Sequence, residues 1–430
     1  MRNSKKFTLA ALAATGALLL AACSGGGGGS AAGKVTWTTW GTPDELKAFD
    51  EVNSEFKVAN PDIDLVFQPT ASYGEYHSKL TTQLTSKTAP DVFYVGDDHI
   101  ANLVANDVLA PIEDCLASEG STIALDMFNP EIYQIAQKDG KTYALPNDVN
   151  PDAYWYSKDA LEAAGITEDP AELAAKDQWT IDKFFEMTEK MDAAGIVGAA
   201  YWNYWATWQT ILSSEGTPAY SAEGEFIGDS AEAIAGMQEW ADHFQAGDLA
   251  LADVMPAGSD ADTLFVTQKL GFLVQGRYTV GTVEGAGQDI SRYDVVRWPT
   301  RSGAEEPVGV ASSFLAINKD AGDMDAACKF FQFFLDKEGQ TLRLQDNGNA
   351  LPSITGIDNI VTDSGKPANV EALIEMRDDG FSNNRVEAAV PGLSGDIAET
   401  IILPLFQGKI DAAAAMGQIA ELIAANGSGE

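Results

Sequence analysis

The sequence predicts an α/β fold built on a parallel, doubly wound sheet, because strand and helix patterns alternate from residue 35 onward. Three apolar segments are expected as strands: Val35–Trp40, Ile63–Phe67 and Asp91–Val95. The segments between them carry apolar residues at helical spacing. This βαβαβ order is typical of a sheet whose strands are joined by helices that cover its faces.

The two intervening helices have local signals of their own. Thr42-Pro43-Asp44-Glu45 is a capping box with proline at the first helical position, and it predicts a helix start at that point. The apolar positions with helical spacing are Leu46, Phe49, Val52 and Phe56 in the first helix and Tyr76, Leu80 and Leu84 in the second.

This sheet also predicts the place of a site. In open α/β sheets, ligands bind beyond the carboxyl ends of the strands where the strand order reverses. With the order 2-1-3, that edge carries Trp40-Gly41-Thr42 and Gly96-Asp97-Asp98-His99.

From about Ile112 onward, longer helical patterns alternate with apolar segments and polar loops. Further strands are expected over Leu270–Val274 and Val308–Ile317. Further helices are expected over Trp179–Met191, Ala231–Phe244, Asp323–Leu342 and Ile410–Ala425. No repeat period is visible, which excludes solenoids and propellers.

The first 22 residues have the features of a secretory signal. A basic start precedes the apolar segment Phe7–Ala22, and Leu20-Ala21-Ala22-Cys23 resembles the bacterial lipobox. We therefore expect a lipoprotein signal peptide over 1–22, a lipidated Cys23 and a flexible, glycine-rich tether to residue 34. The apolar segment is shorter than the ~20 residues that a membrane-spanning helix needs.

Composition limits the fold and the partners. A chain of 430 residues with 45% hydrophobic content normally holds two domains with full cores. Its formal net charge of −37 is spread along the chain, which argues against nucleic acid as a partner.

Beyond Cys23, the chain has Cys115 and Cys328, which could form a disulfide outside the cytoplasm. Because Cys328 lies in the apolar helical pattern Ala326–Leu335, a buried free thiol is the alternative.

Residues suited to catalysis or metal binding are sparse. None of His77, His99 and His243 lies near a Gly-x-Ser-x-Gly turn, and the acidic residues lack the spacing of zinc or calcium motifs. We expect no metal, no cofactor and no enzyme activity. Among 64 acidic residues, carboxylate pairs of the kind that glycoside hydrolases use arise by chance and carry no information.

Aromatic residues beside polar ones are more informative. Tyr201–Trp208 is rich in tyrosine and tryptophan, and further rings with polar neighbours are Trp37, Trp40, Tyr154, Trp155, Tyr156 and Tyr278. Such rings stack on the C–H faces of sugars, whose hydroxyls bind planar polar side chains. About half of them are expected in ordinary core positions.

Six short motifs, taken in order, resemble the extracellular solute-binding proteins of sugar ABC importers, the group that includes maltose-binding protein. They are Val35–Trp40 with Gly41, Ala89–Val92 leading to Gly96-Asp97-Asp98, Asn106–Ile112, Gly140–Pro146 with Tyr156–Asp159, Gly276-Arg277-Tyr278 and Ala316–Lys319. The resemblance implies a two-lobed periplasmic-binding-protein-like fold of type II, with hinge-linked lobes and a ligand cleft between them. It implies one lobe from 35–112 with 309–352, and another from 113–308 with 353–430.

The resemblance also implies ligand contacts. The matching positions are Trp40, Asp44 and Asp98 in the first lobe, Asp148 and Asn150 after Leu145-Pro146, and Trp205 and Tyr278 as aromatic platforms. Arg277 replaces a residue that is often apolar in this group, so it would either bind a ligand carboxylate or pair with a nearby aspartate.

The resemblance implies that the protein captures a carbohydrate by hinge closure and delivers it to the transmembrane subunits of an ABC permease. We expect this carbohydrate to be an oligosaccharide. The protein would be a monomer, exported and lipid-anchored at the outer face of the cytoplasmic membrane. The alternatives are a secreted, lipid-anchored glycoside hydrolase, the same fold with a peptide, polyamine or anion as ligand, and a structural adhesion protein.

Overall fold

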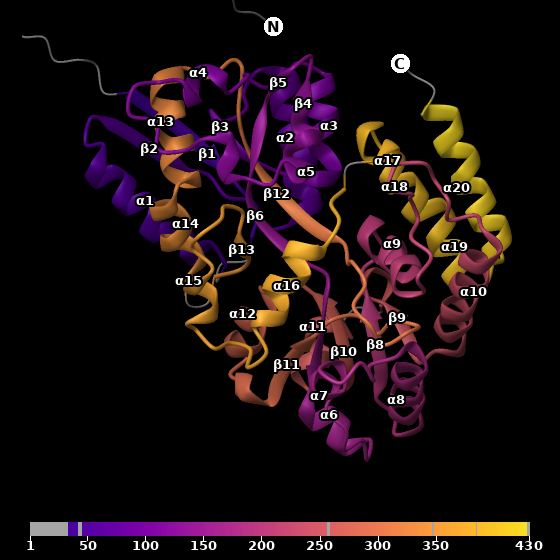
Figure 1. The fold of residues 1–430 in the computed structure, drawn as a ribbon. Coiled ribbons are helices and arrows are strands. Elements are labelled where there is room, and N and C mark those ends of the chain that lie inside the picture. The colour runs from indigo at the N-terminus through magenta and orange to yellow at the C-terminus, as the bar shows by residue number, and fades with distance from the viewer. Residues whose placement is uncertain (1–32, 42–44, 256–258, 346–347, 384, 428–430) are drawn as a thin grey trace, which may run out of the picture. The chain divides into compact units, whose positions relative to one another are not determined.

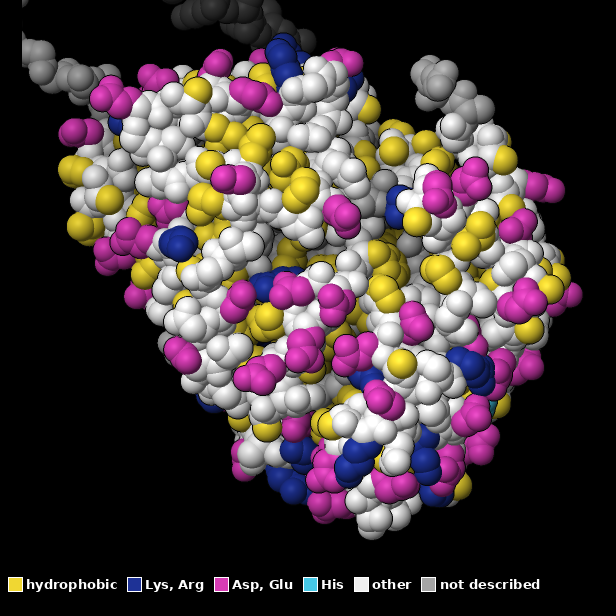
Figure 2. All heavy atoms as spheres, viewed as in Figure 1, with side chains coloured by type: hydrophobic (Ala, Val, Ile, Leu, Met, Phe, Trp, Pro, Cys, Tyr) yellow, Lys and Arg dark blue, Asp and Glu magenta, His cyan; other side chains and the backbone are white. Residues whose placement is uncertain are grey.

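The computed structural model describes residues 33–427, with gaps at 42–44, 256–258, 346–347 and 384. The predicted signal peptide, Cys23, Asp44 and most of the capping box therefore lie outside the described residues. In the described part, no helix is both long enough and apolar enough to cross a bilayer. Acidic side chains are spread over the face shown in Figure 2, as the sequence predicts.

The first sheet of the described chain has six strands in the order β13-β6-β12-β3-β1-β2 (Figure 1). These strands are β1 (Gly33–Thr38), β2 (Ile63–Phe67), β3 (Val92–Gly96), β6 (Ala144–Pro151), β12 (Val310–Ile317) and β13 (Leu351–Pro352). Strand β1 pairs in parallel with β2 and β3, which confirms the predicted order 2-1-3. Strand β12 runs antiparallel to both β3 and β6.

The second sheet of the described chain has five strands in the order β11-β7-β10-β8-β9. These strands are β7 (Ala153–Ser157), β8 (Val197–Tyr201), β9 (Leu249–Leu251), β10 (Leu270–Gln275) and β11 (Tyr293–Val296). A short hairpin is formed by β4 (Gln137–Lys138) and β5 (Lys141–Thr142).

Strand β6 departs from the lobe limits that the sequence predicted. Those limits placed residues 113–308 in the second lobe, whereas Ala144–Pro151 pairs with β12 and β13 in the first sheet. The partner strand begins at Val310, far along the chain, and a pairing at that separation has no local sequence signal.

Helices pack around both sheets. Those before β6 are α1 (Ala48–Ala59), α2 (Tyr73–Ser86), α3 (Asp97–Ala105), α4 (Glu113–Leu116) and α5 (Pro130–Tyr133). Those between β7 and β12 are α6 (Lys158–Ala163), α7 (Pro170–Ala174), α8 (Ile181–Ala193), α9 (Trp205–Ser214), α10 (Ala231–Ala246), α11 (Ala261–Val266) and α12 (Thr279–Gly285). Those after β12 are α13 (Met324–Leu335), α14 (Lys337–Leu344), α15 (Asn359–Thr362), α16 (Glu371–Asp379), α17 (Val386–Ala389), α18 (Leu393–Ile397), α19 (Leu403–Phe406) and α20 (Ala412–Asn426).

The helix predicted over Asp323–Leu342 is two helices, α13 and α14. The break falls at Asp336, whose backbone is extended and whose side chain accepts a hydrogen bond from the Gly339 amide at 2.9 Å. Aspartate at this position caps the second helix because its carboxylate satisfies an amide that has no partner within the helix.

Backbone hydrogen bonds join the segments that connect the two sheets. Strand β6 continues into β7 through Asp152, and residues 297–309 lead from β11 back to β12. The Asp152 amide donates to the Gly309 carbonyl at 2.9 Å. A third segment lies alongside, because the Val310 amide donates to the Phe381 carbonyl at 2.8 Å. The three segments form a narrow ladder between the sheets.

A disulfide joins Cys115 in α4 to Cys328 in α13, with 5.4 Å between the two Cα atoms. The sequence left a disulfide and a buried free thiol open, and the structure has the disulfide. It ties α13, which packs on the first sheet beside α1, to a helix 213 residues earlier in the chain.

Replacing both cysteines, Cys115→Ala with Cys328→Ala, is expected to lower the free energy of unfolding by about 2–4 kcal/mol, because the open chain gains conformational freedom in the unfolded state. The measurement is urea unfolding of the purified protein. An unchanged unfolding midpoint would contradict a stabilising role for this bond.

Candidate functional site

A cavity of about 710 Å³ lies where the two sheets meet. Strand register brings its parts together: Ser313 of β12 is opposite Gly96 at the end of β3 and opposite Asp148 of β6. The second sheet contributes the segment before α9 and the turn that holds Tyr278. Helix α18 and the π-helical turn Ala398–Ile402 close a further side. The predicted edge at the carboxyl ends of β1 and β3 is thus part of the cavity wall.

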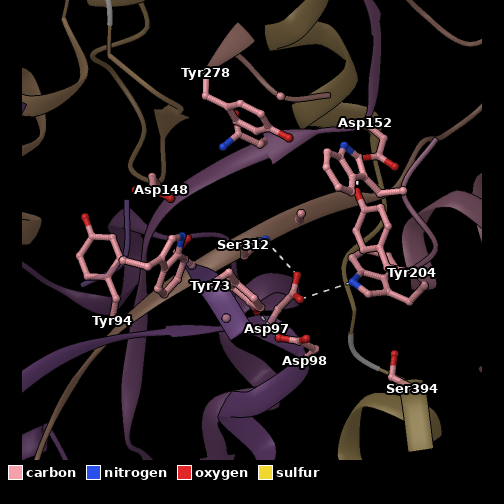
Figure 3. A pocket seen from close by; sticks show the side chains of 18 of the residues that line it. Tyr73, Tyr94, Asp97, Asp98, Asp148, Asp152, Tyr204, Tyr278, Ser312 and Ser394 are labelled. Carbon is pink, nitrogen blue, oxygen red and sulfur yellow. Dashed lines mark hydrogen bonds between the residues drawn. The ribbon is translucent and has the colours of Figure 1, made fainter. Parts of the chain in front are cut away.

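Asp97 begins helix α3 and is almost fully buried at the base of the cavity. Its carboxylate accepts hydrogen bonds from the Ser312 amide at 2.9 Å and from the Trp205 indole N–H at 3.4 Å (Figure 3). Burial, together with the charge of neighbouring Asp98, raises the pKa of Asp97 to about 7. Burial therefore favours the protonated, uncharged form of this carboxyl group more than in a free aspartate.

Asp98 lies at the exposed rim and belongs to a small aromatic group. The Tyr73 hydroxyl donates a hydrogen bond to its carboxylate. Trp40 packs edge-on against Tyr73, with 4.9 Å between ring centroids. His77 lies beneath them, and burial lowers its pKa to about 3, so this histidine is neutral. The group presents a carboxylate and two partly exposed rings to the cavity.

Asp152 lies on the ladder between the sheets, and only 4% of its surface is exposed. The Tyr204 hydroxyl donates to one carboxylate oxygen, Oδ1. The other oxygen, Oδ2, is buried without a hydrogen-bond partner among the described residues. Burial raises the pKa of Asp152 to about 7.

Four further polar atoms of lining residues are also buried without a hydrogen-bond partner in the described chain: the Tyr94 hydroxyl, Trp202 Nε1, Asn203 Oδ1 and Ser312 Oγ. Buried polar groups are usually satisfied, by protein or by water. Unsatisfied groups contributed by both sheets to one cavity indicate that a ligand or water completes their hydrogen bonding.

Asp148 also lines the cavity, but it already has a charged partner. Arg343 of α14 donates to its carboxylate at 3.1 Å, and both side chains are buried. Burial raises the pKa of Asp148, while the Arg343 guanidinium opposes that change. The charge of Asp148 is therefore neutralised within the protein.

Arg277 is fully buried and is absent from the cavity lining. Its guanidinium donates to the backbone carbonyls of Leu344 and Gly348, each at 2.8 Å. Its amide donates to the Asn150 side chain at 2.9 Å. Arg277 thus positions Asn150 and the loop after α14, and the structure does not bring its guanidinium to the site where a ligand would bind.

The structure brings most of the predicted site residues together. Those that line the cavity are Trp40, Asp98, Asp148, Asn150, Trp205 and Tyr278. Arg277 does not, and Asp44 and Cys23 fall outside the described residues. Trp205 lines the cavity, but only 1% of its surface is exposed and its indole N–H is hydrogen-bonded to Asp97. It therefore has little free ring surface on which a ligand could stack.

Several lining residues were not among the ligand contacts assigned from the sequence. The most informative are Tyr73, Asp97, Asp152, Trp202, Tyr204, Asp253 and Glu399. A signal existed for Asp97, which adjoins Asp98 at the predicted strand end, and for Trp202 and Tyr204, which belong to the aromatic segment. Asp152 had none, because its role depends on the crossing between sheets. No group of histidine, cysteine and acidic side chains suited to a metal occurs in the described residues.

The raised pKa of Asp152 predicts a pH effect on stability. Because its folded-state pKa of about 7 exceeds its usual 3.8, its contribution to stability is complete below about pH 4 and is lost as the pH rises through 7. Asp152→Asn keeps an acceptor for Tyr204 and removes this loss. We expect the ligand-free variant to be about 2–4 kcal/mol more stable than wild type at pH 8.

The measurement is chemical unfolding from pH 4.5 to pH 8. Asp396→Asn, at an exposed carboxylate of α18 outside the cavity lining, serves as the control and should follow wild type. Parallel pH profiles for Asp152→Asn and wild type would contradict the prediction.

Known proteins share this architecture. Residues 39–341 match the family model described as bacterial extracellular solute-binding protein. The substrate-binding protein Lmo0181 of Listeria monocytogenes, solved with cycloalternan, superposes with a TM-score of 0.78 at 20% identity, covering 92% of this chain and 99% of that chain. Maltose-bound MalE3 of T. maritima gives a TM-score of 0.75 at 21% identity, covering 91% and 99%. The sn-glycerol-3-phosphate-binding periplasmic protein UgpB of Rhizobium meliloti is 21% identical over 327 residues, which are 74% of this chain and 75% of UgpB.

The family match confirms the resemblance seen in the sequence motifs. It covers well over half of the chain, and the structural matches confirm the two-lobed α/β fold. The family consists of exported binding proteins, so the expectation of a binder and not an enzyme is also confirmed. The chain belongs to the bacterial extracellular solute-binding proteins.

Proposed function

We propose that this protein captures a carbohydrate in the cavity between its two sheets and delivers it unaltered to the transmembrane subunits of an ABC permease. The observation that carries the proposal is the lining, which combines aromatic rings with carboxylate and amide acceptors around one hollow of about 710 Å³. That volume falls within the ~300–1,000 Å³ of small-molecule sites. Structures of the same fold that hold cycloalternan and maltose support a saccharide ligand.

Trp40 and Tyr278 are the rings best placed to stack on sugar C–H faces, because both line the cavity and both are partly exposed. Asp152 Oδ2 and Asn203 Oδ1 are the acceptors best placed to bind hydroxyls, because neither has a partner in the described protein. A hydroxyl-rich ligand would satisfy these atoms and displace water from the rings.

Capture works through the ladder of Asp152, Gly309 and Phe381. A ligand that touches both lobes favours the closed arrangement, because only that arrangement makes both sets of contacts. The lobe limits of 35–112 with 309–352, and 113–308 with 353–430, form part of this proposal, with residues 113–151 transferred to the first lobe because β6 pairs in the first sheet, α5 packs on β6 and α4 is bonded to α13. The closed monomer is the form that the permease would recognise.

The signal-peptide pattern at the start of the sequence supports a location for capture outside the cytoplasm. A lipid on Cys23 and the glycine-rich tether would hold the binding lobes at the outer face of the cytoplasmic membrane.

The function is tested by titrating the protein with mono- and oligosaccharides and measuring binding by tryptophan fluorescence and by isothermal titration calorimetry. We expect Tyr278→Ala to weaken binding of the best saccharide by tenfold or more, about 1.4 kcal/mol, because a stacking face is lost. Tyr143→Ala, at a half-buried tyrosine outside the cavity lining, should bind as wild type does. Trp205→Ala is a poorer probe, since removal of a buried ring would also destabilise the fold. Absence of binding across the panel would refute the proposal.

Cys23→Ser should prevent lipid attachment in the bacterial host. We expect the variant to move from the membrane fraction to the soluble extracytoplasmic fraction, with saccharide affinity unchanged because Cys23 precedes both of the proposed lobes. Fractionation followed by mass spectrometry of the mature N-terminus measures this. A variant that stays in the membrane fraction would exclude Cys23 as the anchor.

A further inference from the structure

The cavity lining carries charge of one sign. The acidic residues in it are Asp97, Asp98, Asp148, Asp152, Asp253 and Glu399, and in the described chain it includes no lysine, arginine or histidine. The internal gaps cannot add a cation, because residues 42–44, 256–258, 346–347 and 384 hold only Thr, Pro, Asp, Ala, Gly and Asn. The face shown in Figure 2 differs, since lysine and arginine side chains lie there among the acidic ones.

Little of this charge is neutralised within the protein. Among the described residues, Asp148 is the only one of the six that has an arginine or lysine within ion-pair distance, namely Arg343 at 3.1 Å. Asp98 has His99 at 3.7 Å. Asp97, Asp152 and Asp253 accept hydrogen bonds from uncharged donors. For example, the Asn203 backbone N–H donates to Asp253 Oδ2 at 2.6 Å.

A second observation does not depend on the number of charges. Asp152 is 96% buried, it lines the cavity, and its Oδ2 has no hydrogen-bond partner in the described chain. Burial of a carboxylate without a donor is unfavourable. A hydroxyl of a ligand would supply a hydrogen bond alone, whereas an ammonium would supply a hydrogen bond and the missing positive charge.

The aromatic part of the lining suits the same chemistry. Trp40, Tyr73 and Tyr278 all line the cavity and retain exposed ring surface. Ring faces attract cations as well as sugar C–H groups. A ligand with a phosphate or a carboxylate would meet only negative charge.

From this lining we propose that the ligand is a saccharide with a basic amine, an amino sugar or an oligomer of one, whose ammonium binds at Asp152 while its hydroxyls use the remaining acceptors. The inference rests on the proposed function and narrows it. Neutral sugars bind more weakly than their amine counterparts, and acidic or phosphorylated sugars are excluded from the cavity.

The test compares matched ligands by calorimetry at pH 7. Glucosamine and its β-1,4-linked di- and trimers are titrated beside their N-acetylated forms and beside cellobiose and maltose, with spermidine as an amine that lacks a sugar ring. We expect an amine-bearing saccharide to bind at least about tenfold more tightly than its N-acetylated form, with affinity that falls as salt is added.

Asp152→Asn should reduce that tenfold preference to less than about threefold, because the carboxylate is lost and the shape is kept. Glu399→Gln, at an exposed rim residue, provides an independent second test, and a partial loss of preference is expected. Asp396→Asn should keep the full preference.

The outcomes separate the two proposals. If a neutral saccharide binds as tightly as every amine-bearing one, or more tightly, the amine inference fails and carbohydrate capture stands. If spermidine binds while no saccharide does, or if nothing in the panel binds, carbohydrate capture fails together with the inference.

Discussion

The site depends on the backbone ladder between the sheets. The hydrogen bond from the Asp152 amide to the Gly309 carbonyl joins the two connecting segments, and the bond from Val310 to Phe381 adds the third. Any change in the angle between the sheets must be taken up in these few residues, because the strands on either side are held by their ladders. Asp152 therefore places a buried carboxylate on the ladder that joins the two sheets, at the edge of the cavity.

Local pattern predicted much of the first sheet. Strand β2 has the predicted bounds, and β1 and β3 begin and end within two residues of theirs, because apolar strands and helical spacing are properties of the segment itself. The pairing of β6 with β12 and the disulfide between Cys115 and Cys328 could not be predicted in the same way. Both join residues more than a hundred positions apart, and their energy comes from partners that no window of sequence contains.

The sequence predicted those site residues that directly follow a strand. It could not predict the residues whose role depends on how deeply they are buried. Asp98 was expected from its place after β3 and lines the cavity. Of the rings singled out in the sequence, Trp40, Trp202, Tyr204, Trp205 and Tyr278 reach the cavity, whereas Trp37, Tyr154, Trp155, Tyr156, Tyr201 and Trp208 are in the core. Residue type cannot separate these two sets, since both pack aromatic faces against neighbours. The place of Arg277 could not be predicted for the same reason, because the sequence does not distinguish an arginine that binds buried backbone carbonyls from one that faces a ligand.

Asp148 and Asp152 show that the protein treats two equally buried carboxylates of one cavity in different ways. Asp148 receives Arg343, so its charge is balanced whether or not a ligand is present. Asp152 receives a single tyrosine hydroxyl and leaves Oδ2 unsatisfied. A carboxylate with only a structural role could be replaced by an uncharged residue with little loss of stability, because burial of an unpaired charge is unfavourable. In the function proposed above, that unfavourable term has a use, because a ligand that compensates it at the ladder between the sheets gains most when both lobes contact the ligand.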